Sequence, residues 1–306
     1  MTTVEMESFD DSGVELGRPT GRAARFWRGM KRQPAAVVAG VILAVIFLAG
    51  AIIPTFATSG NYINLSNAWR NHAPTWRSWH LLGTNGIGQD VLLRTIYGVH
   101  QSEQSAIYAS VLATVLGVAI GGLAAYRGGA VDALLMRLAD VLSVYPALLL
   151  LLAAYVFFSP VTVMKATTIL ALYLWIPVAR VVRGEIFSLR GREFVDAAIA
   201  SGASDTRIFF RHLLPNAGGT IVIAATALFG QVIMLEATVE FFGLGVSDQQ
   251  TQTIGNLIGD GQRAVLTQGW GWWGWAGPAA VLVVIIVCAN LVGDGIADAL
   301  RPSGRR

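Results

Sequence analysis

Charged residues and cysteines are scarce in this chain of 306 residues. Only 13% of the residues are charged, whereas about 25% is usual in a soluble domain. The one cysteine, Cys288, excludes an intrachain disulfide. Neither of the two lysines, Lys31 and Lys165, follows a G-x-x-x-x-G phosphate-binding pattern, and the four histidines show no zinc-ligand spacing. These absences exclude a P-loop ATPase and a disulfide scaffold, and they favour a membrane protein over a soluble domain.

Apolar residues make up 54% of the sequence, and the mean hydropathy is +0.56. They are gathered in six runs, each near the roughly 20 residues that a membrane-spanning helix needs. The runs cover residues 35–53, 105–126, 134–158, 163–182, 217–241 and 276–297. The first run lacks a clear cleavage site and exceeds a signal-peptide core, so it is predicted to stay as a span. The sequence thus predicts an all-α membrane protein, with a six-helix domain at residues 34–302 between polar tails at 1–33 and 303–306.

Positive charge is distributed unevenly between the segments that join these runs. With the N-terminus inside, the inner segments hold 17 of the 22 lysines and arginines. Cytoplasmic segments are enriched in positive charge, so both termini and the segment 183–216 are predicted to be cytoplasmic. The basic part of the N-terminal tail, with Phe26, Trp27 and Met30 interleaved, either lies along an anionic membrane surface or acts only as a topology signal.

One polar block, EFVDAAIASGASDTRIFFRHLLPN at residues 193–216, separates two apolar runs. Glu193 and Asp196 would lie in the first turn of a helix, where the helix dipole favours anions. Gly202 is suited to end that helix, and Pro215 to begin the next one. The block is therefore predicted to hold a short cytoplasmic helix between two spans.

Polar residues also occur inside two apolar runs, where they are costly and usually face a cavity or a partner. Glu236 and Glu240 lie one helical turn apart near the outer end of the fifth run. They are interpreted either as a substrate-ammonium contact in a pathway or gate, or as inter-helix hydrogen bonds. Asn290, Asp294 and Asp298 share one face of the last run. Asn290 is the third candidate for the pathway, and the aspartates are expected to pair with arginines of the cytoplasmic loop.

Glycine, proline and tryptophan patterns indicate how the helices pack and sit in the bilayer. Gly117 and Gly121 form a small-xxx-small pair, which lets two helices approach closely. Pro146 and Pro177 are candidates for helix kinks. The tryptophans of GWGWWGWAGP, residues 269–278, are interpreted as an aromatic belt at the outer interface.

The block 193–216 resembles the cytoplasmic loop of ABC importer permeases, whose motif reads E-A-A, three residues, G, a spacer and I-x-L-P. Here D-A-A at residues 196–198 is followed by Gly202 and by L-P at residues 214–215. Asp196 stands in place of the usual glutamate, and His212 in place of isoleucine. The longer run R-E-F-V-D-A-A-x-x-x-G-A-S, followed by R-H-L-L-P-N, is similar to the dipeptide and oligopeptide branch.

Three other stretches carry the same resemblance. LGTNGIGQDVLLRTIYG, residues 82–98, is similar to L-G-T-D-x-x-G-R-D-x-x-S-R-x-x-x-G, with Asn85 and Gln89 in place of charged residues. EATVEFFGLGV is similar to E-A-x-x-x-F-L/F-G-L-G-V, with Glu240 in place of a small residue. NLVGDGIADALRP is similar to N-L-L-G-D-G-L-R-D-x-L-D-P. Over residues 80–302 the chain therefore resembles the C-type permease subunits of dipeptide and oligopeptide (Dpp/Opp-type) importers.

This resemblance implies a type I ABC importer permease fold in the bacterial plasma membrane, with residues 193–201 as a coupling helix. Its partners would be a homologous B-type permease, two ATPase domains (separate or fused), a substrate-binding lipoprotein and membrane lipid, without nucleic acid. ATP and Mg would be bound by the ATPase partners, so this chain would hold no cofactor and would not itself be an enzyme. The residues implied in coupling to the ATPase are Glu193, Phe194, Asp196, Ala197, Ala198, Gly202, Ala203, Ser204 and Arg211.

Functions other than peptide import stay open at this point. A permease of the same architecture would also serve nickel, glutathione or haem. A self-sufficient secondary transporter or channel would need ionisable residues at mid-membrane or broken helices in repeated halves, and the sequence shows neither. A membrane enzyme would need a Ser/His/Asp set or a metal cluster on one membrane face, and the sequence does not show one.

Overall fold

The regular structure in the described part of the chain is almost entirely helical. The computed structural model describes residues 29–31, 33–56, 70–76, 80–244, 252–269 and 271–300. The two predicted tails lie outside these residues, apart from residues 29–31 and 33. The helices are α2 (Pro34–Phe56), α4 (Val91–Arg127), α5 (Gly129–Val144), α6 (Ala147–Phe157), α7 (Val163–Arg190), α8 (Glu193–Ala200), α9 (Asp205–Ile208), the π-helical segment η2 (Phe209–Leu213), α10 (Leu214–Phe241), α11 (Ile254–Gln268) and α12 (Trp273–Leu300).

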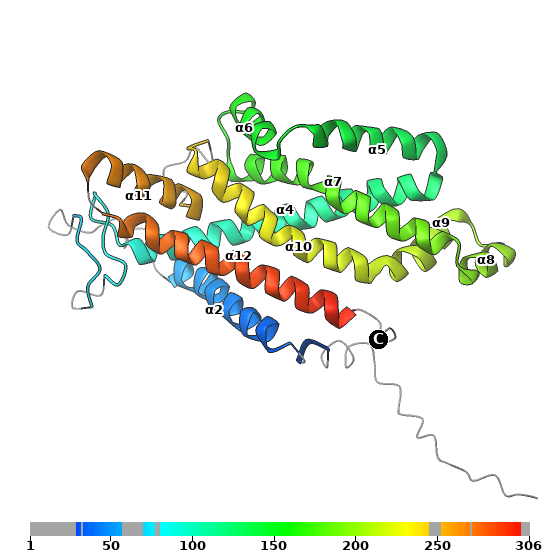
Figure 1. Cartoon of the computed structure of the whole chain (residues 1–306), viewed down its shortest axis with the longest axis horizontal. Helices are drawn as coiled ribbons and strands as arrows, with labels where there is room; N and C mark the ends of the chain where they lie inside the picture. Colours follow the sequence, from blue (N-terminus) through cyan, green and yellow to red (C-terminus); the bar gives the residue numbers. More distant parts are fainter. Residues whose placement is uncertain are drawn as a thin grey trace, which may run out of the picture.

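The predicted spans correspond to five long helices and one bent pair (Figure 1). The helices α2, α4, α7 and α12 are each long and apolar enough to cross a membrane, as is the continuous helix Asp205–Phe241 that joins α9, η2 and α10. The helices α5 and α6 reach that length only together, and they meet at an angle of 89°. The third predicted span, residues 134–158, is therefore a bent pair rather than one straight helix.

Proline explains the break between α5 and α6. Pro146 has no N–H to continue the helix, and a proline disfavours the helical conformation for the residue before it. Tyr145 accordingly has φ −81° and ψ 137°, which is extended backbone. Pro177, the other predicted kink, lies inside α7, which continues as a helix through it.

Two ion pairs hold α5 against α7. Arg183 of α7 donates to both carboxylate oxygens of Asp132, at 2.5 and 2.6 Å. Arg180, one turn earlier, donates to Asp140 at 3.0 Å. A bidentate pair restricts orientation more than a single contact does, so the first pair fixes the direction in which α5 leaves the end of α4.

Glycines allow α4 and α7 to pack backbone to backbone in the most extensive helix contact of the bundle. A Cβ at Gly121 would lie 2.2 Å from the carbonyl oxygen of Ala179, and a Cβ at Gly117 would lie 2.5 Å from Cβ of Val178. No side chain fits at either distance, because the neighbours are backbone or branched atoms. The predicted small-xxx-small contact is confirmed.

Several helices extend beyond the apolar runs that predicted them. The helix α4 begins at Val91 rather than near residue 105, α7 continues to Arg190, and α12 begins at Trp273. At the start of α4 the Asp90 carboxylate accepts a hydrogen bond from the Leu93 N–H at 2.9 Å, which caps the helix. Hydropathy misses such ends because polar turns at the membrane surface are still helical.

The amphipathic helix α11 was not predicted. Its first half is buried, with Ile254 and Leu257 in the interior, and its second half is exposed. Trp273, at the start of α12, donates from Nε1 to the carbonyl oxygen of Thr84 at 3.0 Å. It thereby ties α12 to the outer loop, the segment 80–90 before α4 that the charge distribution predicts to lie on the outer side. Trp270 lies outside the described residues, and the aromatic belt stays a prediction.

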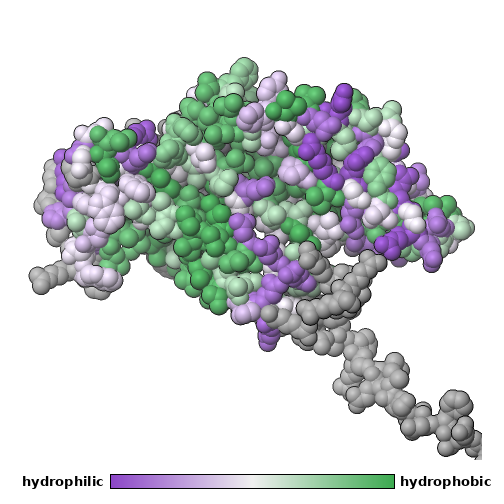
Figure 2. Space-filling view, viewed as in Figure 1, coloured by the Kyte–Doolittle hydropathy of each residue, from purple (hydrophilic) through white to green (hydrophobic). Residues whose placement is uncertain are grey.

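The helices α8 and α11 lie at opposite ends of the bundle (Figure 1). The start of α2 and the end of α12 point toward the end that carries α8, as an even number of spans requires. Figure 2 shows apolar side chains over the middle of the visible face and polar ones toward both ends. If the charge-based orientation holds, α8 is cytoplasmic and α11 lies on the outer side.

Candidate functional site

The polar block 193–216 forms α8, a tight turn and the beginning of the helix that becomes α10. The turn is a Schellman motif, in which the Gly202 N–H donates to the Ile199 carbonyl at 2.9 Å and the Ala203 N–H donates to the Ala198 carbonyl at 3.1 Å. Gly202 has φ +74°, where a residue with a side chain is strained. The predicted end of the short helix at Gly202 is confirmed.

One face of α8 packs against the protein and the other is open. Val195 and Ala198 belong to the hydrophobic core, whereas Phe194 is 37% exposed and Ile199 is 58% exposed. The other exposed residues of the predicted coupling set are Glu193, Asp196, Ala197, Gly202, Ser204 and Arg211.

Ala198 and Ala203 lie differently from the rest of the predicted coupling set. Both pack against the core of this chain. Their small side chains therefore let α8 approach its own bundle, whereas Ala197 and Ala200 are exposed. Of the alanines implied in coupling on α8, Ala197 lies open and Ala198 lies against this chain.

Aromatic packing anchors the loop to the end of α4. Phe209 lies edge-on to Tyr126, with ring centroids 5.8 Å apart, and a Cβ at Gly122 would lie 2.7 Å from the Phe209 ring. Arg190 crosses the same junction: it donates to the Ala125 carbonyl at 2.7 Å, and its guanidinium lies over the Tyr126 ring. This anchor was not predicted from the sequence, in which Gly122, next to Gly121, is the available signal.

The anchor connects directly to a spanning helix. Arg211 and His212 lie in η2, a π-helical turn inside the otherwise continuous helix Asp205–Phe241. Pro215 lies in the first turn of α10, as predicted, and the helix is not interrupted there. π-Helical turns often mark functional sites. A displacement of the loop would be passed to α10 without an intervening flexible joint.

The three residues predicted for a pathway do not form one site. Glu236 and Glu240 are 4% and 2% exposed, inside this chain's own bundle, and Ser105 of α4 lies beside Glu236. One carboxylate oxygen of each glutamate has no hydrogen-bond partner among the described residues. Asn290 is exposed on α12 opposite Gly230, about 9 Å from Glu236 along α10. This placement supports inter-helix contacts for the glutamates, and the substrate contact stays a prediction.

The aspartates near the end of α12 were expected to pair with loop arginines. Asp298 accepts a hydrogen bond from the side chain of Gln33, next to the start of α2, and Asp294 is exposed. A Cβ at Gly295 would lie 2.4 Å from Cβ of Ala36. Asp298 therefore helps to join α12 to α2. Among the described residues, no three His, Cys, Asp or Glu side chains come together as metal ligands.

In the outer loop, two amides replace the charged pair of the resembling motif. The Asn85 side chain donates to Gln89 at 3.0 Å and accepts from the Gln89 N–H at 2.8 Å, which closes a tight loop. Asp90 contacts His80 at 2.7 Å, and Arg94 donates to Gln252 beside α11. These contacts tie the outer loop to α4 and α11.

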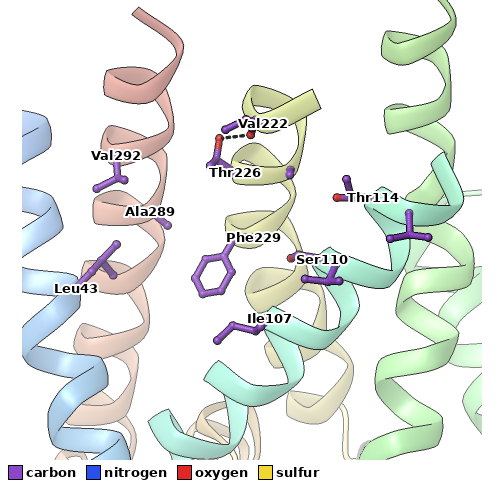
Figure 3. Close-up of a pocket in the computed structure, with 12 residues that line it drawn as sticks. Leu43, Ile107, Ser110, Thr114, Val222, Thr226, Phe229, Ala289 and Val292 are labelled. Atoms are coloured by element: carbon purple, nitrogen blue, oxygen red, sulfur yellow. Dashed lines mark hydrogen bonds between the residues drawn. The ribbon is translucent and has the colours of Figure 1, made fainter. Parts of the chain in front are cut away.

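An apolar groove of about 490 Å³ lies between α2, α4, α10 and α12 (Figure 3). In Figure 3, Ile107 and Phe229 project into it from α4 and α10. The hydroxyls of Ser110 and Thr114 are buried in its wall without a hydrogen-bond partner among the described residues. Its lining residues are Leu43, Ile107, Ser110, Val111, Thr114, Val115, Val222, Ala225, Thr226, Phe229, Ala289 and Val292. Such a lining suits an apolar group better than acid–base chemistry.

The membrane-spanning bundle, with an anchored helix presented at one end, defines a permease subunit of a transporter. The chain belongs to the family of binding-protein-dependent transport system inner membrane components, which matches residues 113–306. Residues 22–74 match the N-terminal transmembrane domain of oligopeptide transport permease C. The resemblance found in the sequence is confirmed.

Full-length relatives agree with this assignment. The oligopeptide transport system permease protein OppC of Escherichia coli K12 is 32% identical over 300 residues, with 98% of this chain and 97% of that protein covered. The dipeptide transport system permease protein DppC of Bacillus subtilis is 32% identical over 282 residues, covering 92% and 85%. OppC of Mycobacterium tuberculosis H37Rv is 33% identical over 283 residues, covering 91% and 94%.

A solved structure supports the fold. An inward-facing conformation of the MetNI methionine ABC transporter matches with a TM-score of 0.56 at 18% identity, covering 69% of this chain and 97% of that chain. The predicted type I ABC importer permease fold is confirmed, and the chain is a multi-pass inner membrane protein.

Proposed function

We propose that this chain is the C-type permease subunit of an ATP-driven importer for dipeptides and short oligopeptides. The observation that carries the proposal is the open face of α8, with Phe194, Ala197 and Ile199 exposed on a helix that is anchored to the bundle. The cargo class is supported by relatives named for dipeptide or oligopeptide transport, which are 32–33% identical over more than nine-tenths of this chain.

The open face of α8 has the chemistry of a docking surface. Full burial of a phenylalanine or isoleucine side chain contributes roughly 1.5–3 kcal/mol, and the exposed parts of Phe194 (37%) and Ile199 (58%) together correspond to about one such side chain. Ala197 adds little bulk, which lets the α8 backbone approach a partner. The partner is an ATPase domain that binds ATP and Mg, and two such domains serve this chain and a homologous permease.

The connection of α8 to α10 provides a path from ATP hydrolysis to movement of the pore. Closure of the ATPase domains on ATP would draw the two coupling helices together. Because α8 leads through η2 into α10, this movement would reorient α10 and open the pore to the outer side. A substrate-binding lipoprotein would then release peptide into the cavity between the two permease chains.

The orientation is tested by cysteine labelling. The single native cysteine, Cys288, is buried, so the background is low. A Ser204→Cys variant is expected to react with an impermeant maleimide only when the cytoplasmic face is accessible, because Ser204 is exposed on the loop. The matched control is Leu266→Cys on α11, where Leu266 is 77% exposed, and it should react in intact cells. Labelling of Ser204→Cys in intact cells would show that the loop lies on the outer side and that the inferred orientation is reversed.

Cargo is tested by uptake of radiolabelled trialanine in cells that carry the whole importer and in cells without this chain. Loss of this chain is expected to abolish the ATP-dependent part of the uptake, and plasmid-borne wild type should restore it. Unchanged trialanine uptake, together with lost uptake of nickel, glutathione or haem, would show that the architecture is right and the peptide cargo is wrong.

A further inference from the structure

The carboxylate of Glu240, near the end of α10, lies at the beginning of α11. It is adjacent to the Thr253 side chain and the Gly255 backbone, and Glu240 and Thr253 are both buried. The Thr253 Oγ1 accepts a hydrogen bond from the Asn256 N–H at 3.3 Å, as the N-cap of α11. Its hydroxyl proton is therefore available to Glu240. The backbone at Gly255, in the first turn of α11, is the second polar neighbour of the same carboxyl group.

The helices α10, α11 and α4 are closely packed around the contact between Glu240 and Thr253. A Cβ at Gly255 would lie 2.5 Å from the Ala237 carbonyl oxygen and 2.8 Å from Cβ of Glu240. On the other side, a Cβ at Gly98 of α4 would lie 3.1 Å from the Ile254 nitrogen. The start of α11 is thus clamped between α10 and α4, and Glu240 supplies the polar contact on the α10 side.

The helix that carries Glu240 near its end begins in the coupling loop. From Asp205 to Phe241 the helix is continuous over 37 residues, which corresponds to about 55 Å. Its first turns, α9 and η2, belong to the anchored loop, and its last turn carries Glu240. Residues in the second half of α11 are exposed at the outer end of the bundle, Arg263 and Leu266 among them.

We propose that Glu240 is a positioning residue for transport: it fixes α11 to α10, so that a displacement of the coupling loop on the cytoplasmic side moves the outer helix. The proposal rests on the function proposed above, because it needs a motor that moves the loop. It gives a role to the glutamate that replaces a small residue of the resembling motif. Without this contact, α10 would still move, but α11 would keep its contacts with α4 and α12 and would follow α10 less closely.

The test uses two variants that break the contact from opposite sides. Glu240→Leu keeps a side chain of similar size and removes both carboxyl oxygens, and Thr253→Val keeps the shape and removes the hydroxyl. Each is expected to lower trialanine uptake by about tenfold, the equivalent of roughly 1.4 kcal/mol. The ATPase activity of the complex purified through a tag on this chain should stay within about twofold of wild type. The conservative variant Thr253→Ser, which keeps the hydroxyl, should transport normally.

Measuring uptake and ATP hydrolysis separately distinguishes a loss of coupled movement between α10 and α11 from a loss of folding. Wild-type uptake in both Glu240→Leu and Thr253→Val would overturn the proposal. A parallel loss of membrane abundance, ATPase activity and uptake in both would also overturn it, since it would show a purely structural contact. If the wild-type complex takes up no trialanine at all, the proposed cargo fails. The same comparison of uptake with ATPase activity is then made for the variants with the substrate that the wild-type complex does transport.

Discussion

The substitution Ala197→Trp is expected to reduce peptide uptake by about tenfold or more while the protein stays in the membrane at normal abundance. Ala197 is exposed on the open face of α8, so a tryptophan side chain there would extend away from the core of this chain. In a docked interface, added bulk typically costs about 1–3 kcal/mol. A tenfold change in binding corresponds to about 1.4 kcal/mol. The measurements are trialanine uptake and the amount of ATPase that co-purifies with the chain.

The matched control is Ala130→Trp. Ala130 is also exposed on a helix at the same end of the bundle, in the first turn of α5. This variant should keep at least half of the uptake and the full amount of ATPase. The Asp196→Glu variant, which restores the residue of the resembling motif, should be nearly silent. Normal uptake with full ATPase recovery in Ala197→Trp would reduce α8 to a connector between two spans. Gly202→Leu is a poorer probe, because Gly202 has φ +74° and a side chain there strains the backbone of the loop itself.

The substitution Gly121→Ala is expected to destabilise the folded chain strongly. The added Cβ would lie 2.2 Å from the Ala179 carbonyl oxygen and 2.8 Å from its Cα. These atoms are backbone, so no rotamer change relieves the contact and α4 must move away from α7. The expected loss is about 3 kcal/mol, the upper end of the range for overpacking. It is measured as a lower midpoint of thermal unfolding in detergent and a lower abundance in the membrane.

Gly219→Ala provides the control for this prediction. Gly219 also lies in a spanning helix, α10, but a Cβ there would meet nothing within 4 Å. Because alanine favours helix over glycine by about 1 kcal/mol, this variant should be as stable as wild type or slightly more stable. Equal stability of Gly121→Ala and Gly219→Ala would show that α4 and α7 do not pack as closely as the structure has them.

The spans and the candidate positions of their bends followed from the sequence, but which of the two prolines bends its helix did not. Pro146 and Pro177 look alike in the sequence, since each lies within an apolar stretch. Pro146 ends a helix, whereas Pro177 lies inside α7, next to the Val178 and Ala179 that pack on the glycines of α4. Tertiary packing therefore decides whether a proline breaks a membrane helix, and a search for apolar runs does not contain that information.

The coupling loop was predicted as a block, but not in its orientation. Glu193 and Asp196 mark the exposed side of α8, but Phe194 and Ile199 are apolar and also exposed, so hydropathy does not separate the two faces of this eight-residue helix. The burial of Ala198 depends on the core that it packs against, which the sequence of α8 does not contain. The contact between Glu240 and Thr253 was hidden for the same reason, because the two residues come together only when α11 folds back on α10.

The most direct test of the account is photo-crosslinking from Phe194. Phe194→p-benzoylphenylalanine keeps an aromatic side chain on the open face of α8, and Leu266→p-benzoylphenylalanine places the same probe on α11 at the other end. Irradiation of membranes that contain the complete importer is expected to join the Phe194 variant to a P-loop ATPase, identified by mass spectrometry. The Leu266 variant should give no such product. If the Phe194 variant forms products with lipid or its own chain alone, while uptake in the same cells is normal, then the loop 193–216 does not dock the motor.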